Sequence, residues 1–301
     1  MSSPPTGFAH NGDVKIAYEE LGGAGGEPLL LVQGASVTRF WWPQGLVHEL
    51  IARGFHVVSY DNRDAGQSTH FPTTEASPVT ALFRRTPPAY TGEDVTADAC
   101  AVMDAMGWNA AHLFGHSNGG LNAQRIAILH PHRVLSLATS AAVSSDAGRM
   151  KLLRFIRFGM VARMARLDFP ETREGDIAMS LAVARALASP GFPFDEAEAL
   201  SRIEKDDTCP VRNNSTMGRQ LGAHWSSGSL KLLRLPTVVL HGDSDQLLRT
   251  SAARDLARSI PDAKLVITPG VGHDIPQGIW ERYADQIRAV ADAAHPHPPP
   301  R

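Results

Sequence analysis

The sequence predicts an α/β protein with a doubly wound, mostly parallel sheet and an inserted helical lid. Two observations predict the sheet. Short apolar runs of strand length alternate with segments of helical period in the first half of the chain, and the same alternation returns near the end. Strands separated by helices imply right-handed crossovers and parallel neighbours. A third observation, a long stretch with helical patterns and no clear buried strand, predicts the lid.

The elements of the first half alternate in type. Residues 14–21 alternate apolar and polar side chains, as in a half-exposed antiparallel strand. An acidic first turn and a terminal glycine favour a helix over residues 91–107. We further expect buried strands at 28–34, 55–64, 110–117 and 133–142, and a helix at 121–130 that ends before a proline.

The pattern changes over residues 144–233, where helices are predicted at 151–167, 176–188 and 195–205. The segment 154–166 is basic and amphipathic, a pattern that can indicate a membrane surface. More often such a helix lies on its own protein, and we expect that here.

The α/β alternation resumes after this stretch. We therefore divide the chain into an α/β core, residues 1–143 and 234–301, and a helical lid, residues 144–233, over the carboxyl ends of the strands. In the last part of the core, strands are predicted at 235–245 and 263–270 and helices at 253–261 and 276–294.

Composition excludes several classes of function. The chain has 301 residues, 43% of them hydrophobic, and a net charge of −2, so nothing favours nucleic acid or an acidic membrane as a partner. It has no run of about 18 apolar residues, and its start lacks the pattern of a signal peptide. Cys100 and Cys209 have no metal-site spacing and are expected to be free thiols. We expect a cytoplasmic protein, either a monomer or a homodimer.

A serine lies between two glycines where a predicted buried strand gives way to a predicted helix. Gly115, Ser117 and Gly119 form the G-x-S-x-G pattern in the strand–turn–helix context that it requires. A turn this tight needs small neighbours, and the amino end of the following helix favours an anionic intermediate. The pattern predicts that Ser117 is a nucleophile.

A serine nucleophile needs a base and an orienting carboxylate, which follow it in this order: serine, acid, histidine. His273 lies in a glycine-rich loop after the last predicted strand and is the expected base. Asp243, Asp245 and Asp274 are the candidate acids. We favour Asp245 because it is far enough from the preceding turn to reach across to the histidine. Asp243 can simply cap that turn, and Asp274 is adjacent to the histidine in sequence and usually would point elsewhere.

The oxyanion of a tetrahedral intermediate needs hydrogen-bond donors. The backbone N–H of Asn118, directly after the nucleophile, is one candidate. The second is the N–H of Ala35, in the loop after the strand at 28–34, where Gly34 permits a turn. Trp41 and Trp42, together with the apolar lid helices, suggest a pocket for a bulky hydrophobic group. The two tryptophans are equally compatible with core packing.

Taken together, the motifs QGAS, YDNRDAGQS, GHSNGG, HGDSDQLL and GVGHDIP resemble the α/β-hydrolase superfamily over residues 12–294. More narrowly, the chain is similar to the aclacinomycin methylesterase group, which shares the turn at residues 60–68, the lid length and the segment GFPFDEAEA. We expect Asp61, Arg63 and Asp64 to form ion pairs inside this turn, in a structural role.

The resemblance implies a serine carboxylesterase without a metal or an organic cofactor. It assigns Ser117 as nucleophile, Asp245 as acid and His273 as base, with oxyanion donors at Ala35 and Asn118. The expected partner is a small to medium hydrophobic ester, cleaved through an acyl-enzyme.

Other functions remain compatible with the same residues. A lactonase, thioesterase, amidase, carbon–carbon hydrolase or cofactor-free perhydrolase would use the same three groups. A small-molecule sensor that retains them is an alternative from another class, and slow or single turnover would distinguish it. A serine at position 117 argues against haloalkane dehalogenases and epoxide hydrolases, which use an aspartate.

Overall fold

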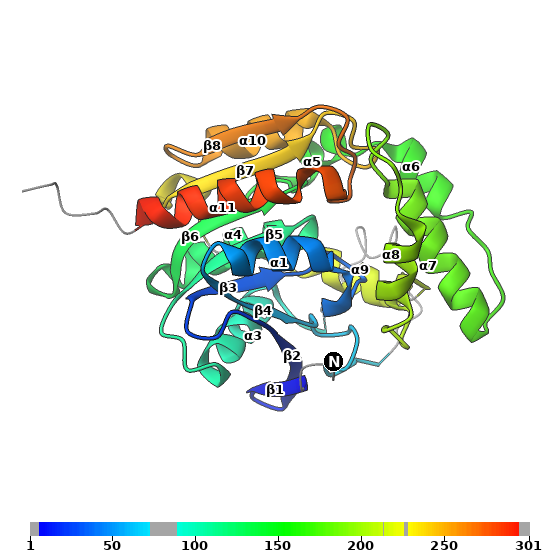
Figure 1. Ribbon diagram of the computed structural model, residues 1–301, viewed down its shortest axis with the longest axis horizontal. Helices are drawn as coiled ribbons and strands as arrows, with labels where there is room; N and C mark the ends of the chain where they lie inside the picture. The colour runs from blue at the N-terminus through cyan, green and yellow to red at the C-terminus, as the bar shows by residue number, and fades with distance from the viewer. Residues whose placement is uncertain (1–5, 73–88, 213, 226–227, 295–301) are drawn as a thin grey trace, which may run out of the picture.

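A computed structural model describes residues 6–72, 89–212, 214–225 and 228–294. Its strands form one eight-stranded sheet in the order β1-β2-β4-β3-β5-β6-β7-β8 (Figure 1). The pairings β1·β2 and β2·β4 are antiparallel and the others are parallel, which confirms the predicted sheet. The strands are β1 (Thr6–Asn11), β2 (Val14–Gly22), β3 (Glu27–Val32), β4 (Phe55–Tyr60), β5 (Ala111–His116), β6 (Val134–Ser140), β7 (Thr237–Gly242) and β8 (Lys264–Thr268).

Helices cover both faces of the sheet. Successive residues of β3 point to opposite faces, so that Leu30 and Val32 join one apolar cluster while Leu29 and Leu31 join the other. Burial on both faces explains why the parallel strands are continuous apolar runs in the sequence. One face packs against α3 (Gly92–Ala105), α4 (Asn118–Leu129) and α10 (Thr250–Ser259), and the other against α1 (Gln44–Ala52) and α11 (Trp280–Ala294).

The direction of strand order reverses at β3 and β5, which are neighbours in the sheet. The chain adds β4 on one side of β3 and then crosses to the other side for β5 to β8. Ligands of open α/β sheets bind at such a reversal, outside the carboxyl ends of the strands. The loops after β3 and β5 therefore meet at the position where a site is expected.

Helix α3 shows the ends that its sequence predicts. The Thr91 hydroxyl accepts a hydrogen bond from the Asp94 N–H at 3.2 Å, and the Asp94 carboxylate accepts one from the Thr91 N–H at 2.7 Å. This capping box satisfies donors of the first turn. Gly107, with φ of 69°, follows the end of the helix.

The sequence prediction missed β1, α1 and α9 (Asn214–Gly222). Strand β1 contains a glycine and few β-branched residues, and its pairing with β2 places it in the sheet. The signal for this hairpin was the dipeptide Asn11-Gly12, since Gly12 has φ of 58° in the connecting turn. Helix α4 begins at Asn118, three residues earlier than predicted. The prediction started too late because the first turn contains two glycines, which have low helix propensity.

A helical insertion separates β6 from β7. In Figure 1 its helices α6, α7 and α8 lie to the right of the sheet, beyond the carboxyl ends of the strands. The insertion contains α5 (Arg149–Phe155), α6 (Phe158–Met164), α7 (Arg173–Leu187), α8 (Glu196–Ile203) and α9 (Asn214–Gly222).

The prediction of one continuous helix over residues 151–167 is wrong. The helix breaks between α5 and α6, where Ile156 forms an antiparallel bridge with Leu248. The Arg157 N–H donates to the Leu247 carbonyl at 2.9 Å, and the Arg249 N–H donates to the Phe155 carbonyl at 2.8 Å. Pairing with the loop after β7 therefore overrides the local helical pattern.

The prediction of ion pairs inside the turn after β4 is also wrong. Each charged side chain of the turn pairs with a distant residue. Arg63 pairs with Asp98 of α3 at 2.6 Å, and Asp64 pairs with Arg219 of α9 at 2.7 Å. The turn therefore connects the core to the insertion.

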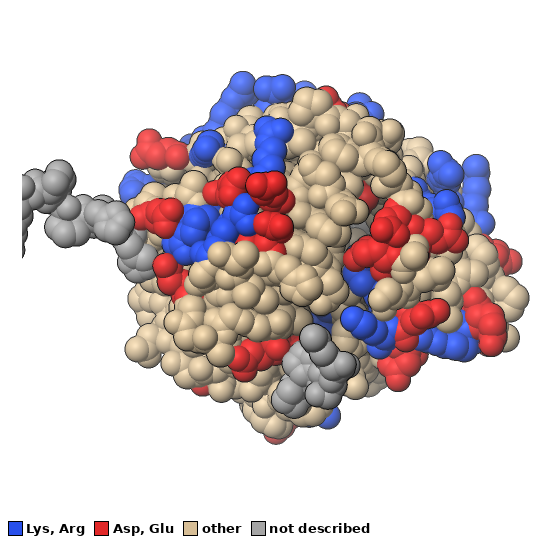
Figure 2. Space-filling view, viewed as in Figure 1, with Lys and Arg blue, Asp and Glu red and all other residues tan. Residues whose placement is uncertain are grey.

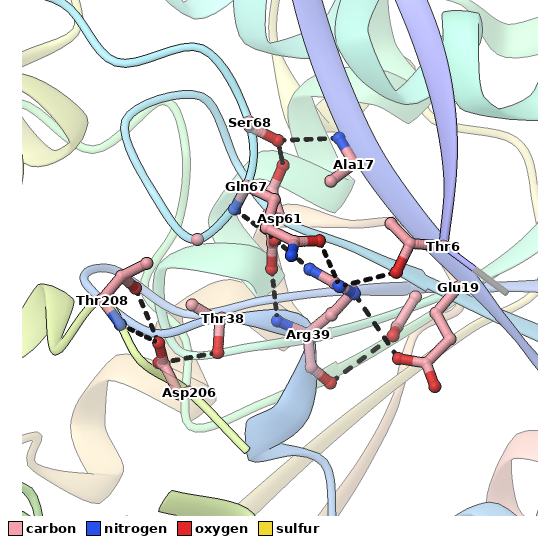
Figure 3. Close-up of polar contacts among 12 residues, drawn as sticks. Thr6, Ala17, Glu19, Thr38, Arg39, Asp61, Gln67, Ser68, Asp206 and Thr208 are labelled. Atoms are coloured by element: carbon pink, nitrogen blue, oxygen red, sulfur yellow. Dashed lines mark hydrogen bonds and ion pairs between the residues drawn. The ribbon is translucent and has the colours of Figure 1, made fainter. Parts of the chain in front are cut away.

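Asp61, the third charged residue of this turn, pairs with Arg39 (Figure 3). Its carboxylate also accepts the backbone N–H groups of Arg39 at 2.8 Å and Gln67 at 3.0 Å. Arg39 further lies 3.4 Å from Glu19 and donates to Thr6 at 3.1 Å. Burial raises the pKa of Asp61 and of Glu19, although the Arg39 charge opposes this. Arg39 is therefore the cation that compensates two buried carboxylates in this cluster.

Candidate active site

Ser117 lies in a strained turn between β5 and α4. Its φ is 55° and its ψ −124°, a conformation that non-glycine residues rarely adopt. A Cβ atom at Gly119 would lie 2.0 Å from the Val32 carbonyl oxygen, and one at Gly115 would lie 2.3 Å from the Gly119 carbonyl oxygen. Both positions require glycine for steric reasons, and the turn holds the serine at the edge of the sheet.

His273 lies between Ser117 and Asp245. Its Nε2 is 3.0 Å from the Ser117 Oγ, and its Nδ1 is 2.8 Å from the Asp245 Oδ2. The three residues come from the loops after β5, β7 and β8, and these parallel strands end at the same edge. The other two candidate acids have other partners, because Asp243 accepts the Gly270 N–H at 2.8 Å and Asp274 accepts the Ser189 hydroxyl.

The environment keeps Asp245 ionised and makes His273 more basic. Burial raises the pKa of Asp245, but the charge and hydrogen bond of His273 outweigh it and lower this pKa to about 2. Its Oδ1 also accepts the N–H groups of Leu247 and Leu248, both at 2.7 Å. Burial lowers the pKa of His273, but the adjacent carboxylate outweighs it and raises this pKa above its ordinary value.

Two further histidines that the sequence prediction did not use adjoin this pair. The ring of His116 lies 5.4 Å from that of His273, and burial lowers the pKa of His116 to about 3. His241 Nε2 lies 3.6 Å from the Asp245 Oδ2, and burial also lowers the pKa of His241. Both are neutral near pH 7. The sequence could have indicated both, because His116 directly precedes Ser117 and His241 lies four residues before Asp245.

The loop after β3 lies beside the serine. An ideal Cβ on Gly34 would be 3.6 Å from the Ser117 Cβ. Asn62 donates through its side chain to the carbonyl oxygens of Gln33, at 3.2 Å, and Gly34, at 3.3 Å. The Gly34 carbonyl and the Ala35 N–H belong to one peptide group, and in a trans peptide these two groups point in opposite directions. By holding the carbonyl, Asn62 therefore fixes the direction of the Ala35 N–H. Sequence reasoning missed Asn62.

The two predicted oxyanion donors form no hydrogen bond with the described part of the chain. Within the described ranges, neither the Ala35 N–H nor the Asn118 N–H has an acceptor. Asn118 is the first residue of α4, where helical N–H groups have no partner in their own helix. Both groups are therefore available to a ligand oxygen.

The insertion also holds the loop after β3. The Gln220 side chain of α9 accepts the Ser36 N–H at 2.8 Å and donates to the Arg63 carbonyl at 3.0 Å. Two residues further along the loop, the Thr38 hydroxyl donates to Asp206 at 2.8 Å, as Figure 3 shows. The loop is thus fixed from the core by Asn62 and from the insertion by these contacts.

The two tryptophans differ in their surroundings. Trp42 is only 2% exposed, and its ring packs against that of Phe114, with centroids 5.2 Å apart. This position agrees with the core-packing alternative. Trp41 is half-buried, and its carbonyl accepts a hydrogen bond from Arg202 of α8 at 2.6 Å. Trp41 therefore lies where the core meets the insertion.

Cys100 and Cys209 are free thiols, as expected. Among the residues that the structure describes, no group of three or more His, Cys, Asp or Glu side chains has the geometry to hold a metal ion. In the same ranges no helix is both long enough and apolar enough to pass through a bilayer.

A family model described as the alpha/beta hydrolase fold matches residues 27–276. The chain belongs to the α/β-hydrolase family. Relatives of this α/β-hydrolase include the rhodomycin D methylesterases of Streptomyces peucetius, 28% identical, and of Streptomyces sp. strain C5, 27% identical. Each match covers 96% of this chain and 99% of the relative. These matches confirm the resemblance to methylesterases.

The structural comparison agrees with the family. The solved structure of an esterase from Rhodococcus sp. ECU1013 superimposes with a TM-score of 0.72 at 21% identity, over 96% of this chain and 99% of the esterase. This likeness concerns the fold alone. The family match and the methylesterase relatives identify this α/β-hydrolase as an enzyme with hydrolase activity of the esterase type.

Proposed function

We propose that the enzyme hydrolyses a small to medium hydrophobic carboxylic ester through an acyl-enzyme on Ser117. The observation that carries this proposal is the hydrogen-bonded series from Ser117 through His273 to Asp245, with distances of 3.0 and 2.8 Å. The N–H groups of Ala35 and Asn118, which have no acceptor among the described residues, support it. The methylesterase relatives support an ester as the substrate.

In the first half of the reaction, the neutral His273 Nε2 takes the proton of the Ser117 hydroxyl. The serine oxygen bonds to the ester carbonyl carbon, and an electron pair moves to the carbonyl oxygen. The N–H groups of Ala35 and Asn118 stabilise this oxyanion. When the carbonyl re-forms, the bond to the alkoxy oxygen breaks, and His273 gives its proton to the leaving alcohol.

In the second half, His273 takes a proton from water, and the hydroxide attacks the acyl carbon. The bond to the Ser117 oxygen breaks, the serine regains its proton from His273, and the carboxylic acid leaves. Asp245 stays ionised, holds the imidazole and stabilises its charged form in both halves.

The helical insertion is proposed to act as a lid that selects the substrate. It follows β6 and lies beyond the strand ends, and α8 contacts the half-buried Trp41. The group selected is proposed to be a bulky hydrophobic acyl or alcohol part, since sites for such ligands are lined mainly by apolar side chains.

The proposal is tested with p-nitrophenyl esters from acetate to octanoate. We expect steady multiple turnover, and the chain length with the highest kcat/KM measures the acyl pocket. A single burst of p-nitrophenol, equal to the enzyme concentration and followed by no further turnover, would contradict the hydrolase proposal and favour the sensor.

The pH dependence should report the ionisation of His273. The base must be neutral, so kcat/KM should fall as the pH decreases through the pKa of His273, which Asp245 raises above that of a free histidine. Asp245→Asn should move this decline to lower pH and lower kcat by about 10⁴-fold. The measurement is kcat/KM for p-nitrophenyl acetate across the pH range of stability. An unchanged decline in the Asn variant would show that Asp245 does not act on His273.

Asn62→Leu should lower kcat about 10- to 100-fold with little change in KM, because the direction of the Ala35 N–H is lost. The matched control is Asn11→Leu, which removes a hydrogen bond to Asp98 of 2.9 Å far from the serine. Steady-state kinetics and thermal unfolding of both variants give the comparison. If both variants keep kcat, Asn62 has no positioning role.

A further inference from the structure

The first two helices of the insertion carry exposed apolar side chains. Met150 is 78% exposed, Leu153 40%, Phe158 54% and Val161 38%. Residues three apart share a helix face, so α5 and α6 each present an apolar pair to solvent. These are half of the large exposed apolar side chains in the described part of the chain. Exposed apolar residues that gather in this way mark interaction surfaces.

All charged residues in the segment that contains α5 and α6 are basic. Residues 149–166 contain six lysines and arginines and no acidic residue, although the whole chain has a net charge of −2. In Figure 2 separate groups of basic side chains lie along the upper edge of the molecule, near the place of α10 and α5 in Figure 1, and at its upper right, near α6. The positive charge is therefore local and coincides with the apolar residues.

A groove of about 340 Å³ lies between α5 and α10. Its one acidic residue, Asp255, is compensated, because it pairs with Lys151 at 2.6 Å and accepts the Ser144 hydroxyl at 2.8 Å. The arginines of the groove form no ion pair with any described residue. The lining residues are Lys151, Arg154, Phe155, Ser251, Arg254, Asp255 and Arg258.

We propose that the surface of α5, α6 and α10 binds anionic lipid membranes. Guanidinium groups match phosphate oxygens in geometry and charge, so the groove can accept a phospholipid headgroup. Met150 and Phe158 would enter the boundary between headgroups and acyl chains. A soluble phosphate or a nucleic acid would account for the arginines but would leave the exposed apolar side chains without a role.

This inference replaces the expectation that residues 154–166 form a helix lying on its own protein. The residues of α6, which follow the break after α5, are all exposed or half-buried. The same break joins the surface to the loop that carries Asp245, through the Ile156–Leu248 bridge. If this surface binds the membrane, the proposed lid and the loop that carries Asp245 lie close to the membrane. A hydrophobic ester dissolved in the membrane would then be near the proposed site.

The test is co-sedimentation of the full chain with vesicles. We expect binding to mixed phosphatidylcholine–phosphatidylglycerol vesicles, weakened by high salt, and no binding to pure phosphatidylcholine. The variant Arg154→Gln/Arg254→Gln/Arg258→Gln should bind about a hundredfold more weakly. Its matched control, Lys205→Gln/Lys231→Gln/Arg282→Gln, loses the same charge elsewhere on the surface and should bind as the wild type does.

A second pair of variants tests the apolar contribution. Met150→Ser/Phe158→Ser should bind at least about tenfold more weakly. The control, Leu129→Ser/Leu232→Ser, removes two exposed apolar side chains outside this surface and should bind normally. Ser117→Ala should also bind normally, so this result is separate from that of the esterase assays.

Three results would overturn the proposal. One is equal binding to neutral and anionic vesicles, and another is full binding by both the arginine and the apolar variants. The third is absence of binding to the anionic vesicles, and two further measurements then show what the surface does instead. Glycerol phosphate binding would identify a site for soluble anions, and self-association would identify a contact between copies of the chain.

Discussion

Ser117→Ala is expected to lower kcat/KM for p-nitrophenyl esters by about 10⁴-fold or more. The variant loses the oxygen that would form the acyl-enzyme, while His273, Asp245 and the two oxyanion donors remain. Alanine is smaller than serine by one oxygen atom, so the melting temperature should stay close to that of the wild type. The measurement is initial rates for the acetate-to-octanoate series, with thermal unfolding of each protein.

The matched control is Ser259→Ala, which removes a hydroxyl of α10 that donates to the Asp255 carbonyl at 2.9 Å. This variant should keep full activity. If Ser117→Ala hydrolyses the esters as fast as the wild type does, Ser117 is not the nucleophile. The proposed mechanism would then be wrong, although the fold assignment would stand.

Arg39→Leu is expected to lower the free energy of unfolding by about 3–5 kcal/mol. The substitution removes the cation that compensates Asp61, which is buried with 0% exposure. An unpaired buried carboxylate has lost the favourable contacts of the folded state and most of its hydration. Urea unfolding, followed by circular dichroism, measures the change.

The double variant Arg39→Leu/Asp61→Asn separates lost charge compensation from lost packing. Neutralising the second partner removes the unpaired charge, so part of the stability should return. A change below about 1 kcal/mol in Arg39→Leu would mean that backbone N–H groups alone stabilise Asp61. No return of stability in the double variant would assign the loss to packing of the arginine side chain.

The candidate site could be predicted because sheet geometry relates distant sequence segments. Ser117, Asp245 and His273 each follow a strand closely, and parallel strands end at the same edge. The continuous apolar runs indicated those strands, since both faces of the sheet are covered. The same reasoning placed the loop of Ala35 next to the serine.

Contacts made by long or buried side chains could not be predicted in this way. The pairing of Asp61 with Arg39, and of Asp64 with Arg219, depends on how loops fold in space. Local sequence gives no distance between them. Asn62 was missed for the same reason, because its acceptors belong to a loop 28 and 29 residues earlier in the chain. The break after α5 depends on a bridge to Leu248, which is also remote in sequence.

The contacts of Gln220 have a consequence for engineering substrate range. This residue of α9 holds both the Ser36 N–H and the Arg63 carbonyl, next to the proposed oxyanion donor. Mutant libraries that vary α9, as part of the proposed lid, would therefore change the turnover rate together with selectivity. Under the proposed lid function, libraries confined to α7 and α8, with Gln220 kept, would allow selectivity to evolve separately from the rate of the chemical step.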